Sequence, residues 1–361
     1  VIMVRRPMLE PNLNASGLAF TAASLLVFLL ANVVTGHLAE SDKIGPRRAE
    51  AIREGEEHPE QARDLAQHGP GYPLFYLLAS YANEPFFDRD QPEAVRKEAI
   101  ETATARTTAI IGHLAVVIGI VLIGYRHFDN FQTGVAAATL YLLMPYTAQW
   151  TNRVDHVVPA ALLVWAVQSY RRPVVSGILI GLAAGVIYYP LFLLPLWCSF
   201  YWRRGLARFL IGSIGAMIVL VASLALTSTD WANFVGQLRL MFGWTALVPQ
   251  ETIGFWHYHE LALRVPVMAA FVIMCASLAL WPAQKNLGTL LSCTAAVMLG
   301  VQFWHAQEGG IYMAWYLPLL ILTIFRPNLE DRVALSAVSD IQLRWRKKAA
   351  AGVSAAVAIA A

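Results

Sequence analysis

Charge is the scarcest property of this sequence. Of its 361 residues, 14% are charged and 57% are hydrophobic, whereas a soluble domain averages about 25% charged and about 45–50% apolar residues. That imbalance excludes a disordered chain and a soluble enzyme of ordinary composition. The formal net charge of only +3 provides no basic surface for nucleic acid, so we expect no nucleic-acid partner.

Motifs that bind metals, nucleotides or ions are scarce as well. The cysteines Cys198, Cys275 and Cys293 each lie in an apolar run and show neither a metal-ligand spacing nor a disulfide pattern. The chain has no glycine-rich phosphate loop, so a soluble nucleotide ligand is not expected. None of the apolar runs described next carries an acidic residue. Because ion-coupled transporters usually carry charges within the membrane, a transporter of lipids or small solutes is disfavoured.

Long apolar runs are what the sequence has in abundance. A helix needs about 20 mainly apolar residues to cross a bilayer, and ten runs approach that length. They cover residues 18–34, 109–125, 133–150, 157–170, 174–187, 189–202, 209–226, 265–281, 287–304 and 311–325. A further run, 349–361, is too short to span and predicts the start of an eleventh helix. We therefore predict an all-α polytopic integral membrane protein, a single membrane domain over residues 1–361 with ten to eleven transmembrane helices.

Basic residues determine the predicted orientation. If the N-terminus lies in the cytoplasm and the runs alternate, fifteen Lys and Arg residues fall in inside loops and three in the short outside loops. This asymmetry agrees with the positive-inside rule. It depends on dividing residues 174–202 at Pro190, because Arg171 and Arg203 then lie on the same side. Val1, in place of methionine, favours a bacterial chain with a non-standard start codon, so we expect the bacterial cytoplasmic (inner) membrane.

The first outside loop, residues 35–107, is the unusual element of the chain, because it holds fourteen of the 24 acidic residues. Residues 49–67 predict a charged helix, which a turn over residues 68–71 follows. Residues 72–81 are apolar but too short to span, so we expect an amphipathic helix that lies on the membrane surface or re-enters it. Residues 93–106 predict a second polar helix that leads into the next span. Long ordered loops are usually functional.

Glu40-Ser41-Asp42 opens this loop directly after the first span. Such a pair of carboxylates can supply a general base for an attacking hydroxyl or hold a divalent metal ion through oxygen ligands. The alternative interpretation is a solvated loop after a helix. Seven of the nine histidines also fall on the predicted outside, so an active site would face outward.

The segment 151–156, between the third and fourth predicted spans, combines Arg153, Asp155 and His156. The planar guanidinium of Arg153 is suited to grip a phosphate. Asp155 and His156 would then position that phosphate or a sugar hydroxyl. The alternative is that Arg153 and Asp155 form an ion pair at the membrane interface.

The outside loop over residues 227–264 contains Trp256, His257, His259 and Arg264. Aromatic faces beside hydrogen-bonding side chains suit a sugar or a lipid headgroup. The two histidines are a poor metal pair, because residues at i and i+2 do not share one face of a helix. The alternative is a belt of aromatic residues at the interface with the histidines in water.

The turn over residues 303–312 carries His305 and Tyr312 around a Gly-Gly pair, which allows close approach of the backbone. The two side chains would face a site at the membrane surface. A simple loop between two spans is the alternative.

The order of these features resembles the GT-C class of polytopic membrane glycosyltransferases over most of residues 18–325. In that class the first long outside loop opens with a modified Asp-x-Asp motif, and Glu40-Ser41-Asp42 is similar to its Glu-x-Asp form. The sequence HGPGYPLFYLL from His68 resembles the apolar helix later in that loop. The sequence GILIGLAAGVIYYPLFLLPL from Gly177 resembles the glycine-rich span and hairpin of the polyprenol-phosphate-mannose-using branch. The sequences DHVVPAALL from Asp155 and YMAWYLPLL from Tyr312 are similar to the start of the fourth span and to a late span.

The resemblance implies a cell-envelope hexosyltransferase, and specifically a mannosyltransferase. Such an enzyme moves a sugar from a polyprenyl-phosphate carrier to a hydroxyl of a glycan, lipid or protein acceptor on the outside face, with inversion. Asp42 would be the general base, with Glu40 as its alternate or as its partner in binding a divalent metal ion. The candidates for binding phosphate and sugar are Arg153, Asp155, His156, Trp256, His257, His259, Arg264, His305 and Tyr312.

One departure from the family supports a second interpretation. Many relatives carry a lysine before the Tyr-Pro pair of the hairpin, where this sequence has Ile187 and Tyr188 before Tyr189-Pro190. A chain without that phosphate-binding cation would serve as a non-catalytic integral subunit that holds partner subunits in a larger membrane complex.

Overall fold

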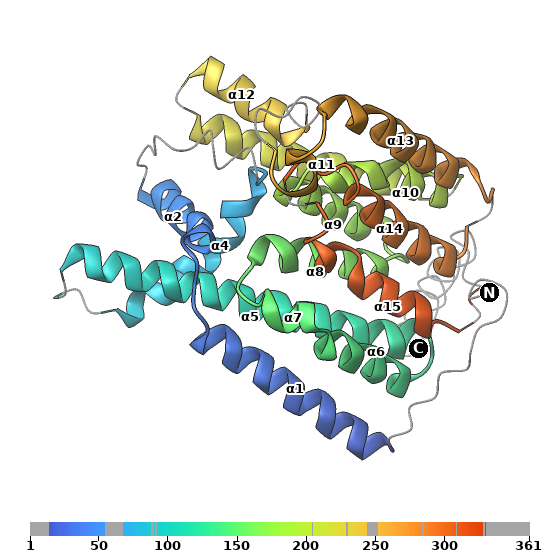
Figure 1. The fold of residues 1–361 in the computed structure, drawn as a ribbon, viewed down its shortest axis with the longest axis horizontal. Helices are drawn as coiled ribbons and strands as arrows, with labels where there is room; N and C mark the ends of the chain where they lie inside the picture. The colour runs from blue at the N-terminus through green and yellow to red at the C-terminus, as the bar shows by residue number, and fades with distance from the viewer. Residues whose placement is uncertain are drawn as a thin grey trace, which may run out of the picture.

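The computed structural model describes residues 14–54, 68–87, 90, 92–203, 205–228, 230–243, 252–283, 285–307, 309–327 and 329. Across these residues the regular structure is helical (Figure 1), with an isolated bridge between Ile253 and Gln307. The predicted all-α class is confirmed. The predicted start of an eleventh helix, residues 349–361, lies outside the described residues.

Within the described residues, four helical segments are long and apolar enough to cross a membrane: α1 (Ala15–Thr35), α5 (Glu93–His127), Leu206–Leu226 within α11, and Leu261–Leu280, which ends in α13 (Arg264–Leu280). The shorter apolar helices are α6 (Phe131–Leu143), α8 (Val154–Gln168), α9 (Pro173–Val186), η2 with α10 (Tyr189–Phe200), α14 (Leu287–Val301) and α15 (Leu317–Phe325). Each predicted run thus coincides with helix, and the chain has the helices of a membrane protein. The count of ten to eleven spans stays a prediction.

The longest apolar helices expose large side chains on their outer faces. Phe20 and Phe28 on α1 are 75% and 71% exposed, and Ile273 on α13 is 66% exposed. Exposed apolar faces of this extent mark contact with lipid or with another protein. They agree with a bundle whose outer helices face a bilayer.

Two prolines determine where apolar runs break. Dividing the chain before Pro190 is confirmed, because α9 ends at Val186 and a 3₁₀ turn, η2 (Tyr189–Leu193), precedes α10 (Leu194–Phe200). The predicted run 133–150, by contrast, does not form one helix. It ends as α6 at Leu143, and Pro145 begins the short helix α7 (Pro145–Gln149). Proline lacks the N–H that would continue the helical hydrogen bonds, which explains both breaks.

A seam of glycines brings α9 and α11 (Leu206–Thr227) close together. Gly177, Gly181 and Gly185 lie four residues apart on one face of α9. A Cβ on Gly177 would lie 2.1 Å from the carbonyl oxygen of Phe209, and one on Gly185 would lie 2.3 Å from Cδ1 of Leu220. Small residues at this spacing permit backbone-to-backbone packing in membrane helices. The seam positions the end of α9, which borders the site.

The segment between α1 and α5 folds onto the N-terminal part of α5 (Figure 1). It contains α2 (Glu40–Glu54), α4 (Gly71–Asn83) and η1 (Glu84–Phe86). The predicted apolar helix over 72–81 is confirmed as α4, and the polar helix over 93–106 is the first part of α5. The charged helix predicted over 49–67 begins earlier, at Glu40, and residues 55–67 lie outside the described residues.

Ion pairs between α2 and α5 hold the loop in place. Nζ of Lys43 lies 3.1 Å from Oε1 of Glu98, and Nε of Arg47 lies 2.9 Å from Oε2 of Glu101. α2 thereby presents its first turn toward the start of α8. The other elements near the candidate site are α12 (Trp231–Met241), η4 (Gly254–His257) and η6 (Met313–Trp315).

Candidate functional site

Asp42 lies in the first turn of α2 and is 7% exposed. Its Oδ2 accepts a hydrogen bond of 3.1 Å from the backbone N–H of Ala39, and its Oδ1 lies 3.7 Å from Nε of Arg153. Burial raises the pKa of Asp42, while the Ala39 hydrogen bond and the charge of Arg153 act in the opposite direction. A carboxylate with a raised pKa is suited to take a proton from a hydroxyl.

Asp155, in the first turn of α8, is the centre of a charged cluster. The other members of this cluster are Asp42, Arg153, His68 and His156. Arg153 donates to both of its oxygens, at 3.0 Å from Nε and 2.9 Å from Nη2. Nε2 of His68 and Nε2 of His156 lie 3.5 Å and 3.8 Å from Oδ2 of Asp155. The N-terminus of a helix favours a negative charge, which helps to explain why this 4% exposed carboxylate is tolerated. The interpretation of Arg153 and Asp155 as an ion pair therefore describes the structure.

Stacked and tilted rings connect this cluster to the turn before α15. The ring centroid of Tyr312 lies 4.8 Å from that of His156 and 4.8 Å from that of His305. Tyr189 in turn lies 4.9 Å from His305. Burial lowers the pKa of His305 to about 3, so its ring is neutral at pH 7. Asp155, His156, His305 and Tyr312, which the sequence placed in two separate segments, thus border one site.

Glu40 lies apart from Asp42. Its carboxylate pairs with Lys43 at 3.0 Å and Arg47 at 2.8 Å, and its side chain is 71% exposed. Residues two apart on a helix do not face each other, so the two carboxylates present no shared set of oxygen ligands. Within the described ranges, no group of three or more His, Cys, Asp or Glu side chains is placed to hold a metal ion. The divalent metal site suggested by the sequence at Glu40 and Asp42 stays a prediction.

Trp256, His257 and His259 belong to a separate turn around η4. The indole N–H of Trp256 donates to the carbonyl oxygen of Phe303 at 3.2 Å, and the Trp256 side chain is buried. His257 and His259 are exposed, and each ring makes a hydrogen bond to a backbone carbonyl in the same turn. These contacts resemble the interface belt more than a part of the charged cluster.

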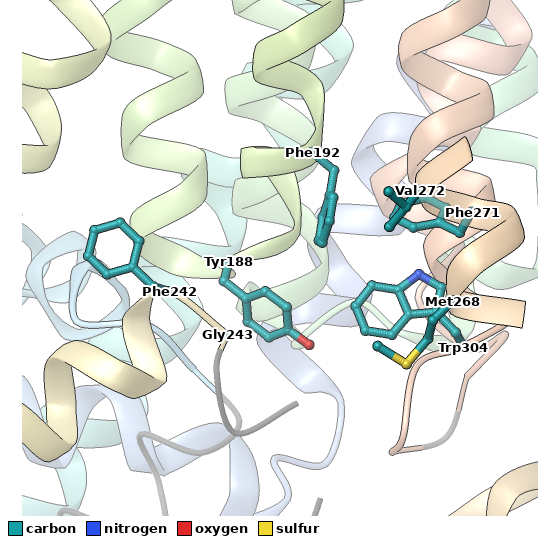
Figure 2. Close-up of a pocket in the computed structure, with 8 residues that line it drawn as sticks. All are labelled: Tyr188, Phe192, Phe242, Gly243, Met268, Phe271, Val272 and Trp304. Carbon is teal, nitrogen blue, oxygen red and sulfur yellow. The ribbon is translucent and has the colours of Figure 1, made fainter. Parts of the chain in front are cut away.

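Arg264 begins α13 and contacts Trp304, which lines a cavity of about 240 Å³. Its Nε donates to the carbonyl oxygen of Trp304 at 2.6 Å, and its guanidinium lies 5.6 Å from the centre of the Trp304 ring. Figure 2 shows the eight lining residues, with the ring of Tyr188 between Phe242 on one side and Trp304 on the other. The lining is almost wholly apolar and aromatic.

The sequence did not nominate His68, Tyr146 or Tyr189, which all contact nominated residues. His68 approaches Asp155 and stacks on Tyr72 at 4.1 Å, and the hydroxyl of Tyr146 hydrogen-bonds Nδ1 of His156. The recognised turn over residues 68–71 was the available signal for His68. No local pattern marks the other two, whose rings come from breaks between helices.

The site thus combines a buried carboxylate, a neutralised arginine and a wall of tyrosine and histidine rings. This set suits proton transfer from a hydroxyl beside a polar ligand that packs on aromatic faces. Comparison of the chain with protein-family models, with curated proteins and with solved structures finds no match. Function therefore rests on the site itself.

Proposed function

We propose that the chain is a membrane glycosyltransferase that moves a sugar from a polyprenyl-phosphate carrier to an acceptor hydroxyl, with inversion. The observation that carries this proposal is the environment of Asp42. It is buried where the first outside loop meets the helix bundle, its pKa is raised, and it faces Arg153 at 3.7 Å. A general base of this kind is what an inverting transfer requires.

Asp42 would accept the proton of the acceptor hydroxyl as its oxygen attacks the anomeric carbon. The bond from that carbon to the carrier phosphate breaks, and the phosphate leaves with the electron pair. Arg153 stabilises the ionised form of Asp42 between proton transfers, and Asp155 holds Arg153 in position through its bidentate pair. The half-buried ring of Tyr312 offers a face on which a sugar can pack.

The proposal includes a topology of ten to eleven spans, with the N-terminus in the cytoplasm and the site on the outer face of a bacterial inner membrane. The excess of basic residues in the predicted inside loops supports it. Mannose is the proposed sugar, and the acceptor is a glycan, lipid or protein of the cell envelope.

A non-catalytic integral subunit is the second candidate, and the pairing of Arg153 with carboxylates of the chain itself favours it. Asp155 occupies Nε and Nη2 of Arg153, and the carboxylate of Asp42 lies 3.7 Å from the same Nε. An arginine neutralised in this way is a poor phosphate ligand, and Ile187 supplies no cation in its place.

Reconstituted vesicles test the proposal directly. We expect the purified chain to release polyprenyl phosphate from a panel of polyprenyl-phosphate sugars that includes mannose, and to do so only with an acceptor present. Glu40→Gln should stay within about twofold of the wild-type rate, because an exposed ion pair contributes little. A stable co-purifying subunit, with no turnover on any donor, would favour the second candidate.

The pH profile of transfer provides an independent check. Asp42 acts as a base only when ionised, so lowering the pH through its pKa should reduce the rate. Because burial raises that pKa, this fall should begin above the pH at which an ordinary aspartate, with a pKa of about 3.9, titrates. Burial also raises the pKa of Glu50 on the same helix, so Glu50→Gln is the matched control and should leave the acid limb in place. An acid limb that moves with Glu50→Gln would remove the assignment to Asp42.

A further inference from the structure

Three arginines from two turns of the chain gather where α9 and α11 begin. Arg172 directly precedes α9, and Arg203 and Arg208 lie on either side of the first residue of α11. All three side chains are exposed, and none of them takes part in an ion pair within the described residues. The sequence contains no acidic residue between Asp155 and Asp230. These arginines therefore form a basic patch to which the segments that carry them supply no carboxylate.

Contacts between the two segments hold this basic patch together. The hydroxyl of Tyr201 donates to the carbonyl oxygen of Tyr170 at 2.6 Å. A Cβ on Gly205 would lie 2.9 Å from Cγ of Pro173. Arg203 lies between Tyr201 and Gly205 in the chain, so its backbone is held next to the turn that precedes α9.

Arg208 reaches the same place from the first turn of α11. A Cβ on Gly212 would lie 2.1 Å from the carbonyl oxygen of Val174, in the first turn of α9. Residues four apart lie on the same side of a helix, so Arg208 lies one turn before this contact, on the side of α11 that meets α9. The contacts along the glycine seam advance in the same direction in both helices. Arg172 and Arg208 can therefore approach one anion together.

An apolar face continues from Arg208 along α11. Ile211, Gly215 and Val219 follow it at i+3, i+7 and i+11, which places them on one face of the helix. Ile211 is 67% exposed and Val219 is 63% exposed, and a Cβ on Gly215 would meet nothing within 4 Å. From Arg208 to Val219 the helix rises about 16 Å, roughly half of the 30 Å hydrocarbon core of a bilayer. The face thus has the length of one lipid leaflet.

The start of α11 has the features of a membrane interface. Leu206–Leu226 is long and apolar enough to cross a bilayer, and a crossing would place its first turn among the lipid headgroups. Trp202, next to Arg203, is 63% exposed, and tryptophan is enriched where a membrane meets water. The predicted topology puts this end of the helix on the cytoplasmic side.

We propose that the basic patch binds the phosphate of an acidic phospholipid, and that one hydrocarbon chain of this lipid lies along the exposed face of α11. A guanidinium matches the geometry of a phosphate and is less strongly hydrated than an ammonium group. Each basic residue at a membrane surface strengthens the binding of acidic lipids about fivefold. The 14 residues of α9 rise about 21 Å from the patch to the end that borders the candidate site. The lipid binding is therefore independent of the proposed sugar transfer.

Native mass spectrometry of the full chain, titrated with dioleoyl phosphatidylglycerol or dioleoyl phosphatidylcholine, tests the patch. We expect the wild type to bind phosphatidylglycerol at least tenfold more tightly than phosphatidylcholine. Arg172→Gln and Arg208→Gln should each weaken the binding of phosphatidylglycerol about fivefold, and the double variant should weaken it more than tenfold. Arg239→Gln, which removes an exposed arginine on α12, is the matched control and should change nothing.

A charge-conserving variant separates loss of charge from damage to the fold. The double variant Arg172→Lys, Arg208→Lys should keep most of the preference for phosphatidylglycerol. A loss equal to that of the double glutamine variant would trace the effect to damaged structure and overturn the assignment. Unchanged lipid binding in the double glutamine variant, or an equal loss in Arg239→Gln, would do the same.

Two soluble probes identify the source of the phosphate. Inorganic phosphate and glycerophosphoglycerol, which is the headgroup without its chains, should not displace phosphatidylglycerol at equal concentration. Effective displacement by either would identify a site for a free phosphate and overturn the assignment to a lipid. Asp42→Asn should bind phosphatidylglycerol as the wild type does, so failure of the transferase proposal leaves this test unaffected.

Discussion

Asp42→Asn is expected to reduce sugar transfer by about 10²–10⁴-fold, the usual contribution of a general base. The amide keeps the size of the side chain, and its oxygen can still accept the hydrogen bond from Ala39. It cannot accept a proton from an attacking hydroxyl. The initial rate of transfer in reconstituted vesicles is the measurement.

The fold of this variant should be intact, because burial raises the pKa of Asp42 and a neutral group at this position relieves the cost of burying a charge. An unchanged elution volume and thermal midpoint in detergent would show this. Glu40→Gln removes the exposed carboxylate of the same motif and controls for a change of charge alone. A rate for Asp42→Asn within threefold of wild type would assign the base to another residue.

Asp155→Ala should cause the largest loss of stability, about 3–5 kcal/mol, the range for breaking a buried pair by removing one partner. The variant leaves Arg153 with Asp42, at 3.7 Å, as its remaining ion-pair partner among the described residues. It also removes the carboxylate beside His68 and His156. Thermal or chemical unfolding of the purified chain in detergent measures the effect.

The double variant Arg153→Met, Asp155→Ala separates the lost pair from general damage. Removing both charges should recover much of the stability, because no uncompensated guanidinium remains. If the double variant is as unstable as the sum of both single variants, the pair contributes no coupling. Asp155 would then act through its packing alone.

Much of the helical fold was predictable because membrane helices need long apolar runs. Each of the ten runs coincides with helix, and Pro190 divides α9 from α10 as expected. Pro145 has the same effect on the run 133–150, but the apolar residues on both sides of it concealed the break. Which helices truly cross the bilayer depends on tilt and neighbours, which the sequence does not contain.

The site was predictable in its residue types and not in its geometry. Asp42, Asp155 and Tyr312 were nominated from chemistry and predicted side, and the structure brings them to one region. The sequence left open whether Arg153 binds phosphate or pairs with Asp155, because that depends on a rotamer. His68 and Tyr189 reach the site through contacts between distant segments, which local patterns cannot show.

The turn that carries His68 is hydrogen-bonded to a helix that is synthesised much later. The N–H of Gly69 donates to the carbonyl oxygen of Val186 at 2.8 Å, and a Cβ on Gly69 would lie 2.2 Å from the carbonyl oxygen of Gly185. Those partners are more than one hundred residues downstream, so at ribosomal rates of about 5–20 residues per second this turn waits on the order of ten seconds for them. The turn is therefore synthesised before its docking surface exists, and the site is completed late in biogenesis.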